Sequence, residues 1–111
     1  MSKYGLMIDY EYCSGCHSCE IACRNEKGLS VGEWGIKLTT VGPWQHADET
    51  WEWNNIPVPT KLCDLCASRV AEGKKPACVH HCLAFCMDYG PVEELSKKMA
   101  EKGSKACMFI P

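Results

Sequence analysis

Long apolar segments and an excess of basic residues are both missing from this sequence of 111 residues. No run approaches the roughly 18 consecutive apolar side chains of a membrane-spanning helix. Lysine and arginine number 12 against 14 aspartate and glutamate residues, which argues against a nucleic-acid partner. Residues 1–5 lack the basic and apolar stretches of a secretory signal, so we expect a cytoplasmic chain. Export together with a partner that carries its own signal is the alternative.

The sequence also lacks linkers, low-complexity segments and a recognisable set of catalytic residues. The length suits one domain over residues 1–111. Its core is close to the smallest size that hydrophobic burial alone can stabilise. No serine, aspartate or paired carboxylate pattern accompanies the histidines, so we expect them to be exposed or beside metal ligands, not catalytic. These histidines are His17, His46, His80 and His81. The sequence therefore predicts a non-catalytic chain, in which Lys74 and Lys75 belong to a solvated loop.

Cysteine, in contrast, is abundant. Ten cysteines occur, at positions 13, 16, 19, 23, 63, 66, 78, 82, 86 and 107. In a chain without an export signal, this usage favours metal binding over disulfides. The first four cysteines fall within residues 13–23, too close together to pair comfortably with one another. We therefore interpret the cysteines as metal ligands.

Two other metal sites fit part of the pattern. Residues 13–17 match the C-x-x-C-H signal for covalent haem attachment, but that site needs export and leaves Cys19 and Cys23 without a role. Zinc is the stronger alternative, because four thiolates can close one tetrahedral site. These would be Cys63, Cys66, Cys78 and Cys82. Zinc gives no reason, however, for the 2-2-3 spacing of the first group.

That 2-2-3 spacing is typical of 4Fe-4S clusters, in which each of four irons needs one thiolate. Three cysteines at x2-x2 spacing ligate one cube, and the fourth, after x3, ligates the other cube in two-cluster ferredoxins. The second group repeats this pattern with a longer insertion. The sequence therefore predicts two clusters with crossed ligands. Cluster 1 takes Cys13, Cys16, Cys19 and Cys82, and cluster 2 takes Cys63, Cys66, Cys78 and Cys23.

Two cysteines remain, Cys86 and Cys107. The x3 spacing from Cys82 to Cys86 offers a shifted ligand set, but the second group already supplies four thiolates without it. We interpret both as small buried thiols.

The remaining elements follow from apolar periodicity and from glycine and proline positions. Strands are expected at residues 4–10, 36–41, 51–58, 85–89 and 106–110, and helices at 18–27, 62–72, 77–82 and from Pro91 onward. Gly28 and Gly73 are expected to end the first two helices. Residues 30–60 form a Trp-rich insertion, predicted to be a hairpin, between the two cysteine groups. Its four tryptophans either fill the core or form the centre of an interface, and both interpretations stay open.

The cysteine segments resemble a known family. Cys-Ser-Gly-Cys-His-Ser-Cys-Glu-Ile-Ala-Cys-Arg at 13–24 resembles the first cluster motif of ferredoxin-type electron-transfer subunits of molybdopterin oxidoreductases, the dimethyl sulfoxide reductase group. Residues 63–82, with their long internal spacing, are similar to a later motif of those subunits. The larger members carry four motifs, whereas this sequence has two, and Leu83 follows Cys82 where proline is usual.

The resemblance implies an α+β, bacterial-ferredoxin-like fold with two 4Fe-4S clusters, here with the hairpin insertion and a C-terminal helix. It also implies an electron-transfer subunit that relays single electrons to or from a large catalytic subunit with a molybdenum or tungsten pterin cofactor. Small two-cluster subunits of this kind also resemble those of tungsten or molybdenum aldehyde oxidoreductases. A further redox subunit would complete such a complex, and oxygen-sensitive clusters suit an anaerobic setting. A free two-cluster ferredoxin, acting as a diffusible carrier, is the alternative.

Overall fold

Two separate antiparallel sheets organise the fold. The computed structural model describes residues 3–111. The elements in chain order are β1 (Tyr4–Asp9), α1 (Ser18–Lys27), β2 (Ile36–Gln45), β3 (Trp51–Pro59), α2 (Ala67–Ala71), α3 (Ala77–His80), β4 (Met87–Pro91), α4 (Val92–Lys102) and β5 (Ala106–Phe109). This mixture of helices and strands confirms the predicted α+β class.

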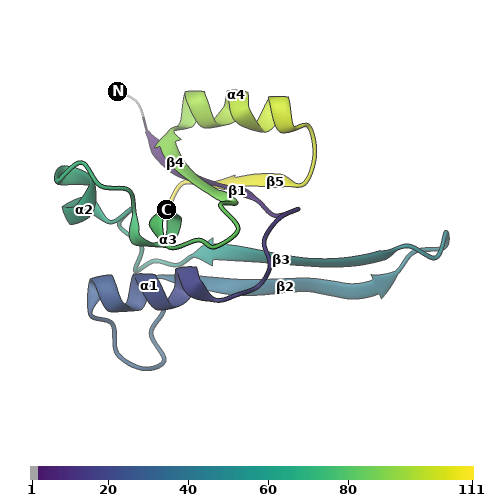
Figure 1. Ribbon diagram of the computed structural model, residues 1–111, viewed down its shortest axis with the longest axis horizontal. Coiled ribbons are helices and arrows are strands. Elements are labelled where there is room, and N and C mark those ends of the chain that lie inside the picture. Colours follow the sequence, from purple (N-terminus) through teal and green to yellow (C-terminus); the bar gives the residue numbers. More distant parts are fainter. Residues whose placement is uncertain (1–2) are drawn as a thin grey trace.

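The first sheet has the strand order β4-β1-β5, with β1 in the centre and β5 at an edge. Helix α4 covers one face of this sheet, and the rest of the protein lies on the other side (Figure 1). Leu6 and Ile8 are two residues apart on β1, so they point to the same face. Both are buried and belong to a core in which the other members are mainly cysteines. This sheet therefore forms one wall of the cysteine-lined interior.

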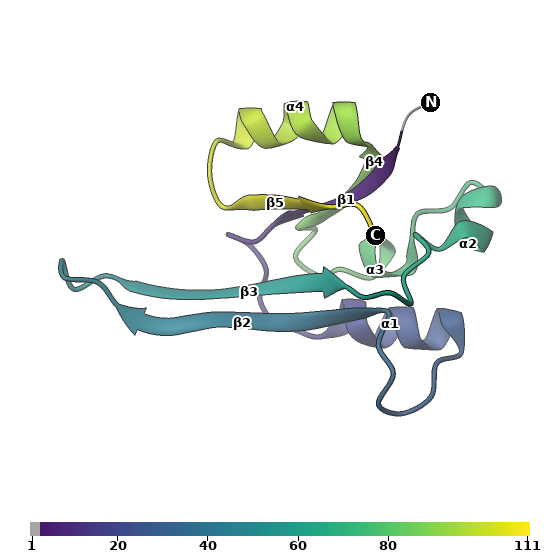
Figure 2. The ribbon, with the colours of Figure 1, turned by 180° about the vertical axis from the view of Figure 1, so that it is seen from behind.

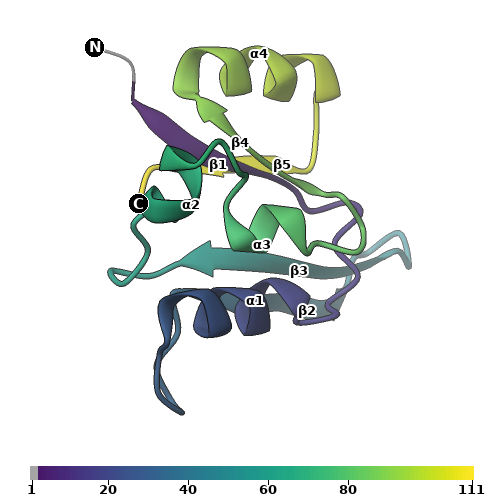
Figure 3. The same ribbon diagram turned by 60° about the vertical axis from the view of Figure 1, so that its left-hand side comes forward.

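The second sheet is a hairpin of β2 and β3. Its register pairs Ile36 with Pro59, and an irregularity between Val41 and Trp44 interrupts the pairing. The base of the hairpin lies between α1 and the first sheet (Figure 3). Its far end projects beyond the rest of the protein, as both opposite views show (Figures 1 and 2). The hairpin thus has a covered base and a free end.

Several predicted elements agree closely with the structure. Helix α1 has the predicted bounds, and Gly28 ends it in the left-handed conformation, with φ 63°. The last helix begins directly after Pro91. The strands expected at 36–41 and 51–58 are present, and the first continues to Gln45.

Other predicted elements are wrong in their bounds. The helix expected over 77–82 ends at His80. The helix expected over 62–72 spans only Ala67–Ala71, and its C-cap is Glu72, not Gly73 as expected. Leu65 and Cys66 have positive φ, at 59° and 51°, so the backbone turns sharply there before any helix can start. The strand expected at 85–89 begins at Met87, because Phe85 also has positive φ, at 53°. Around Leu65 and around Phe85, residues that the apolar pattern assigned to a helix or a strand belong instead to cysteine-bearing loops.

Candidate metal centres

Two small cavities in the core are lined by cysteines. Cavity 1 has the thiols of Cys13, Cys16, Cys19, Cys82 and Cys86 in its lining. Cavity 2 has those of Cys23, Cys63, Cys66 and Cys78. The structure therefore brings together each predicted set of four, and it adds Cys86 to the first. All ten cysteines lie within residues 3–111 and are free thiols.

Helix α1 shares its cysteines between the two cavities. Cys19 and Cys23 are one turn apart, about 6 Å along the helix axis, so they point to the same side of the helix at different heights. The loop before the helix curls through Gly15 and His17, which have φ of 75° and 64°. That curl lets Cys13 and Cys16 line the same cavity as Cys19.

The second cysteine group approaches from the opposite side. The left-handed turn at Leu65 and Cys66 places Cys63 and Cys66 at cavity 2. The Ala77 backbone N–H donates a hydrogen bond to Cys66 Sγ at 3.4 Å. Helix α3 begins there and packs against α1. Cys78 on α3 faces cavity 2, and Cys82, just beyond the helix, faces cavity 1.

Burial is the main cause of a raised pKa at three of the thiols, those of Cys19, Cys23 and Cys78. It raises the pKa of Cys19 to about 12 and that of Cys23 to about 11. Burial also raises the pKa of Cys78, and the nearby charges of both cysteine groups, including Cys19, add to this effect. Cys16 differs, because hydrogen bonds from Ser18 lower the pKa of its exposed thiol. A buried thiolate in such surroundings needs a cation beside it, and the iron of a bound cluster would supply one.

The base of the hairpin closes cavity 2 with very little clearance. A Cβ atom on Gly35 would overlap Cys23 Sγ. Gly35 is buried, and the next residue, Ile36, lines cavity 2. Position 35 therefore requires glycine, because a side chain there would collide with the Cys23 thiol. The spacing of the cysteines does not reveal this requirement.

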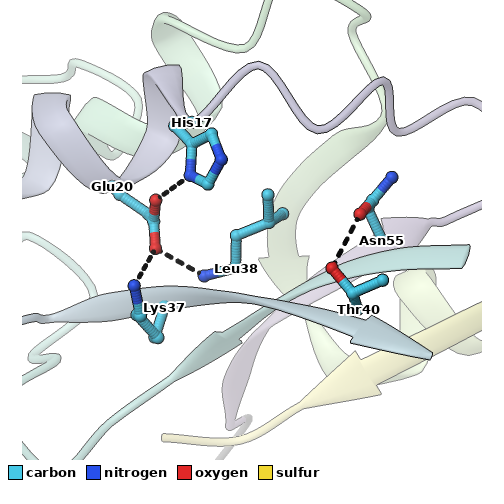
Figure 4. A network of polar contacts seen from close by, with 6 residues as sticks. All are labelled: His17, Glu20, Lys37, Leu38, Thr40 and Asn55. Atoms are coloured by element: carbon cyan, nitrogen blue, oxygen red, sulfur yellow. Dashed lines mark hydrogen bonds and ion pairs between the residues drawn. The ribbon is translucent and has the colours of Figure 1, made fainter. Parts of the chain in front are cut away.

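A buried carboxylate fastens α1 to the hairpin (Figure 4). Glu20 is only 2% exposed, and its Oε2 accepts a hydrogen bond from the Leu38 backbone N–H at 2.7 Å. Lys37 Nζ lies 3.3 Å from the same oxygen, and His17 Nδ1 contacts Oε1. Burial by itself raises the pKa of Glu20, but these hydrogen bonds and the Lys37 charge outweigh it and lower the pKa. Sequence reasoning missed this residue, because a lone glutamate between two cysteines carries no distinctive pattern.

The histidines occupy surface positions, as expected. His17 is 56% exposed at the start of α1, and His46 is 44% exposed near the hairpin end. His80 and His81 are exposed and contact each other edge to face. Lys74 and Lys75 are also exposed, which agrees with the predicted loop.

Three of the four tryptophans lie outside the core. Trp44, Trp51 and Trp53 are 47%, 63% and 66% exposed. The core interpretation is therefore wrong for these three. Trp34 is half-buried, with Lys37 Nζ 4.3 Å and Arg24 Cζ 4.8 Å from its ring centroid.

The lining of both cavities fits 4Fe-4S clusters. Each cavity presents at least four thiols and otherwise mainly apolar side chains, which is the donor set of such a cube. Among residues 3–111, no group of three or more His, Cys, Asp or Glu side chains is arranged to hold a single metal ion. The thiols instead stand around the two cavities.

Comparison with known proteins identifies the family. The profile of the 4Fe-4S dicluster domain matches residues 33–92, which include the hairpin and the second cysteine group. This protein belongs to the dicluster family. The predicted resemblance to iron–sulfur subunits of the dimethyl sulfoxide reductase group is confirmed by individual relatives. Within residues 3–111, no helix combines the length and apolar character needed to cross a bilayer.

Three relatives illustrate the range of the match. The B subunit of the anaerobic dimethyl sulfoxide reductase of Escherichia coli is 31% identical over 101 residues, which cover 91% of the present protein and 38% of the relative. The corresponding subunit from Haemophilus influenzae is 36% identical over 86 residues, which cover 74% of the present protein and 38% of the relative. The B subunit of polysulfide reductase from Wolinella succinogenes is 24% identical and is covered over 93% of its length. This dicluster protein thus spans less than two fifths of the dimethyl sulfoxide reductase B subunits that it matches.

Proposed function

We propose that this protein is an electron-relay subunit that holds two 4Fe-4S clusters within a single domain. Cluster 1 is held by Cys13, Cys16, Cys19 and Cys82, and cluster 2 by Cys23, Cys63, Cys66 and Cys78. One observation carries the proposal: each cavity is lined by a complete set of four thiols drawn from both cysteine groups. When bound, each cluster accepts and releases one electron.

The polypeptide supports the relay by fixing the distance between the clusters. Helix α1 contributes Cys19 to one cavity and Cys23 to the other, one helical turn apart. The segment from Cys78 to Cys82 does the same from the facing side. The two cavities therefore lie next to each other, and the packing of α1 against α3 holds them there.

The partner in this proposal is a catalytic reductase subunit with a molybdenum or tungsten pterin cofactor. The relatives that support this choice are named as B chains of reductases. Electrons would pass singly between that subunit and a second redox partner. We place the complex in an anaerobic cytoplasm, or outside it when a partner provides the export signal.

The free end of the hairpin is the proposed contact with this catalytic subunit. Trp51 and Trp53 alternate with Glu52, so they share one face of β3. Trp44 pairs with Glu52 and points to the opposite face. Large exposed aromatic side chains are typical of interface centres, and these two lie on the hairpin that projects from the fold.

Anaerobic purification with metal analysis tests the proposal. Two clusters require about eight irons and eight sulfides per chain and a paramagnetic signal after reduction with dithionite. If the protein contains zinc and no sulfide, the proposal is refuted and the protein is a structural zinc module. An iron-loaded protein that runs as a monomer in native extract would indicate a diffusible ferredoxin instead.

Double replacement of Trp51 and Trp53 by alanine tests the contact. We expect the variant to keep its iron but to lose co-purification with the catalytic subunit. Trp44→Ala is the matched control, because it removes an exposed tryptophan from the other face of the same hairpin. Equal retention of the catalytic subunit by both variants would contradict the proposed contact.

A further inference from the structure

The lining of cavity 1 contains five cysteine thiols, one more than a cube has irons. Cys86 is 5% exposed, and its Sγ lies 3.5 Å from Cys82 Sγ. It lines the same cavity as the four predicted ligands of cluster 1. Cavity 2 has four thiols in its lining. The fifth thiol therefore distinguishes the two sites.

The backbone holds Cys86 in this position. The Phe85 N–H donates a hydrogen bond to the Cys82 carbonyl oxygen at 3.3 Å, which closes a tight turn. Phe85 takes a left-handed conformation, and its side chain is 87% exposed. The turn sends the next side chain, that of Cys86, into the core. Asp9 then donates its N–H to the Cys86 carbonyl oxygen at 2.7 Å, which ties this residue to β1.

We propose that Cys82 and Cys86 are interchangeable ligands for one corner of cluster 1. Only one of the two thiolates binds that iron at a time, and the other remains a thiol beside it. Exchange breaks one Fe–S bond and forms another, and the incoming thiol passes its proton to the outgoing thiolate. No electron is gained or lost. This inference rests on the proposed function, because it requires cluster 1.

Three variants test the exchange: Cys82→Ala, Cys86→Ala and the double variant. We expect each single variant to keep about eight irons per chain, because the remaining sulfur takes the corner. The double variant should show a three-iron signal of about one spin per chain, or lose cluster 1 and keep about four irons. Cys78→Ala is the matched control in cavity 2, and it should lose a ligand without rescue. Cys107→Ala controls for removal of a half-buried cysteine outside both cavities.

The signal of cluster 2 reports whether each variant is folded. Where Cys82→Ala lacks that signal, Cys82→Ser replaces it, since serine keeps the size of the side chain. The inference is overturned if either single variant loses as much iron as the double variant while cluster 2 persists. Wild-type protein without iron would instead overturn the proposed function, and this failure is seen before any variant is made.

Discussion

The carboxylate of Glu20 accepts the backbone N–H of Leu38 at 2.7 Å, which joins the cysteine-bearing helix α1 to the first strand of the hairpin. Leu38 lines cavity 1, so the bond also sets the position of the cavity wall. Helix, hairpin and cavity are thus connected through one buried side chain.

Removing this carboxylate should weaken the fold. Glu20→Ala leaves the Leu38 N–H without its acceptor, and we expect a loss of about 2 kcal/mol in the free energy of unfolding. Glu20→Gln keeps an acceptor oxygen and should lose about 1 kcal/mol. The midpoint of anaerobic urea unfolding, followed by circular dichroism, measures both. Glu101→Ala, at an exposed site on α4, is the control. A wild-type midpoint for Glu20→Ala would contradict the role given to this residue.

A methyl group at position 35 should expel cluster 2. Gly35→Ala places a Cβ where Cys23 Sγ lies, so we expect iron to fall from about eight to about four per chain. Gly90→Ala is the matched control, because its added Cβ would meet Leu95 Cδ2 at an ordinary 3.8 Å. Iron analysis of both variants gives the answer. Full loading of Gly35→Ala would show that the hairpin base can move away from Cys23.

The proposed crossed ligand sets make a specific prediction for Cys23. Although Cys23 belongs to the first cysteine group, its replacement by alanine should damage cluster 2. The electron paramagnetic resonance spectrum of Cys23→Ala should therefore match that of Cys63→Ala. A match with Cys16→Ala instead would assign Cys23 to cluster 1 and end the crossed assignment.

Removing the iron should loosen the part of the fold around the cavities. The core contains Cys19, Cys23, Cys78 and Cys82, so clusters bound there link α1 to α3. Anaerobic chelation should reduce amide protection in both helices, because binding free energy at such sites is also folding free energy. Hydrogen exchange with mass spectrometry measures this, and reconstitution with iron and sulfide is the control. Unchanged protection in both helices would show that the thiols pack without metal.

Alkaline pH should release the end of α4. Lys102 donates to Glu11 and lies 3.5 Å from Asp9 Oδ1, and the hydrogen bond to Glu11 is the main cause that raises the pKa of Lys102 above 10.5. A raised pKa means that this stabilisation is present below pH 10.5 and is lost as the pH rises through the folded-state pKa. The melting temperature of the wild type should therefore be higher than that of Lys102→Gln at neutral pH. This difference should vanish in strong alkali. Lys97→Gln, at an exposed site on the same helix, should differ from wild type by little at any pH.

Local signals in the sequence predicted much of the fold. The bounds of α1 follow from its apolar spacing and from Gly28, and the start of α4 follows from Pro91. The helix over 62–72 was wrong because periodicity does not reveal the left-handed turn at Leu65 and Cys66. That turn is required by the loop that brings two thiols to one cavity.

The two sets of four thiols were predicted from spacing alone, and the structure brings each set together around a cavity. Glu20 and Gly35 could not be found in this way, since their roles depend on contacts with the hairpin and with Cys23. Cys86 had a visible spacing signal, but only its 3.5 Å approach to Cys82 gives that spacing a meaning. The sequence likewise does not reveal that the hairpin tryptophans are exposed, because their exposure depends on how far the hairpin extends beyond the rest of the protein.

The interleaving of the two cysteine groups has a consequence for biosynthesis. Cavity 2 is incomplete until Cys78 has been translated, and cavity 1 until Cys82 or Cys86 has followed. A nascent polypeptide that still lacks its second half can build neither pocket. If the proposed ligand sets hold, cluster insertion has to wait until both cysteine groups have been synthesised.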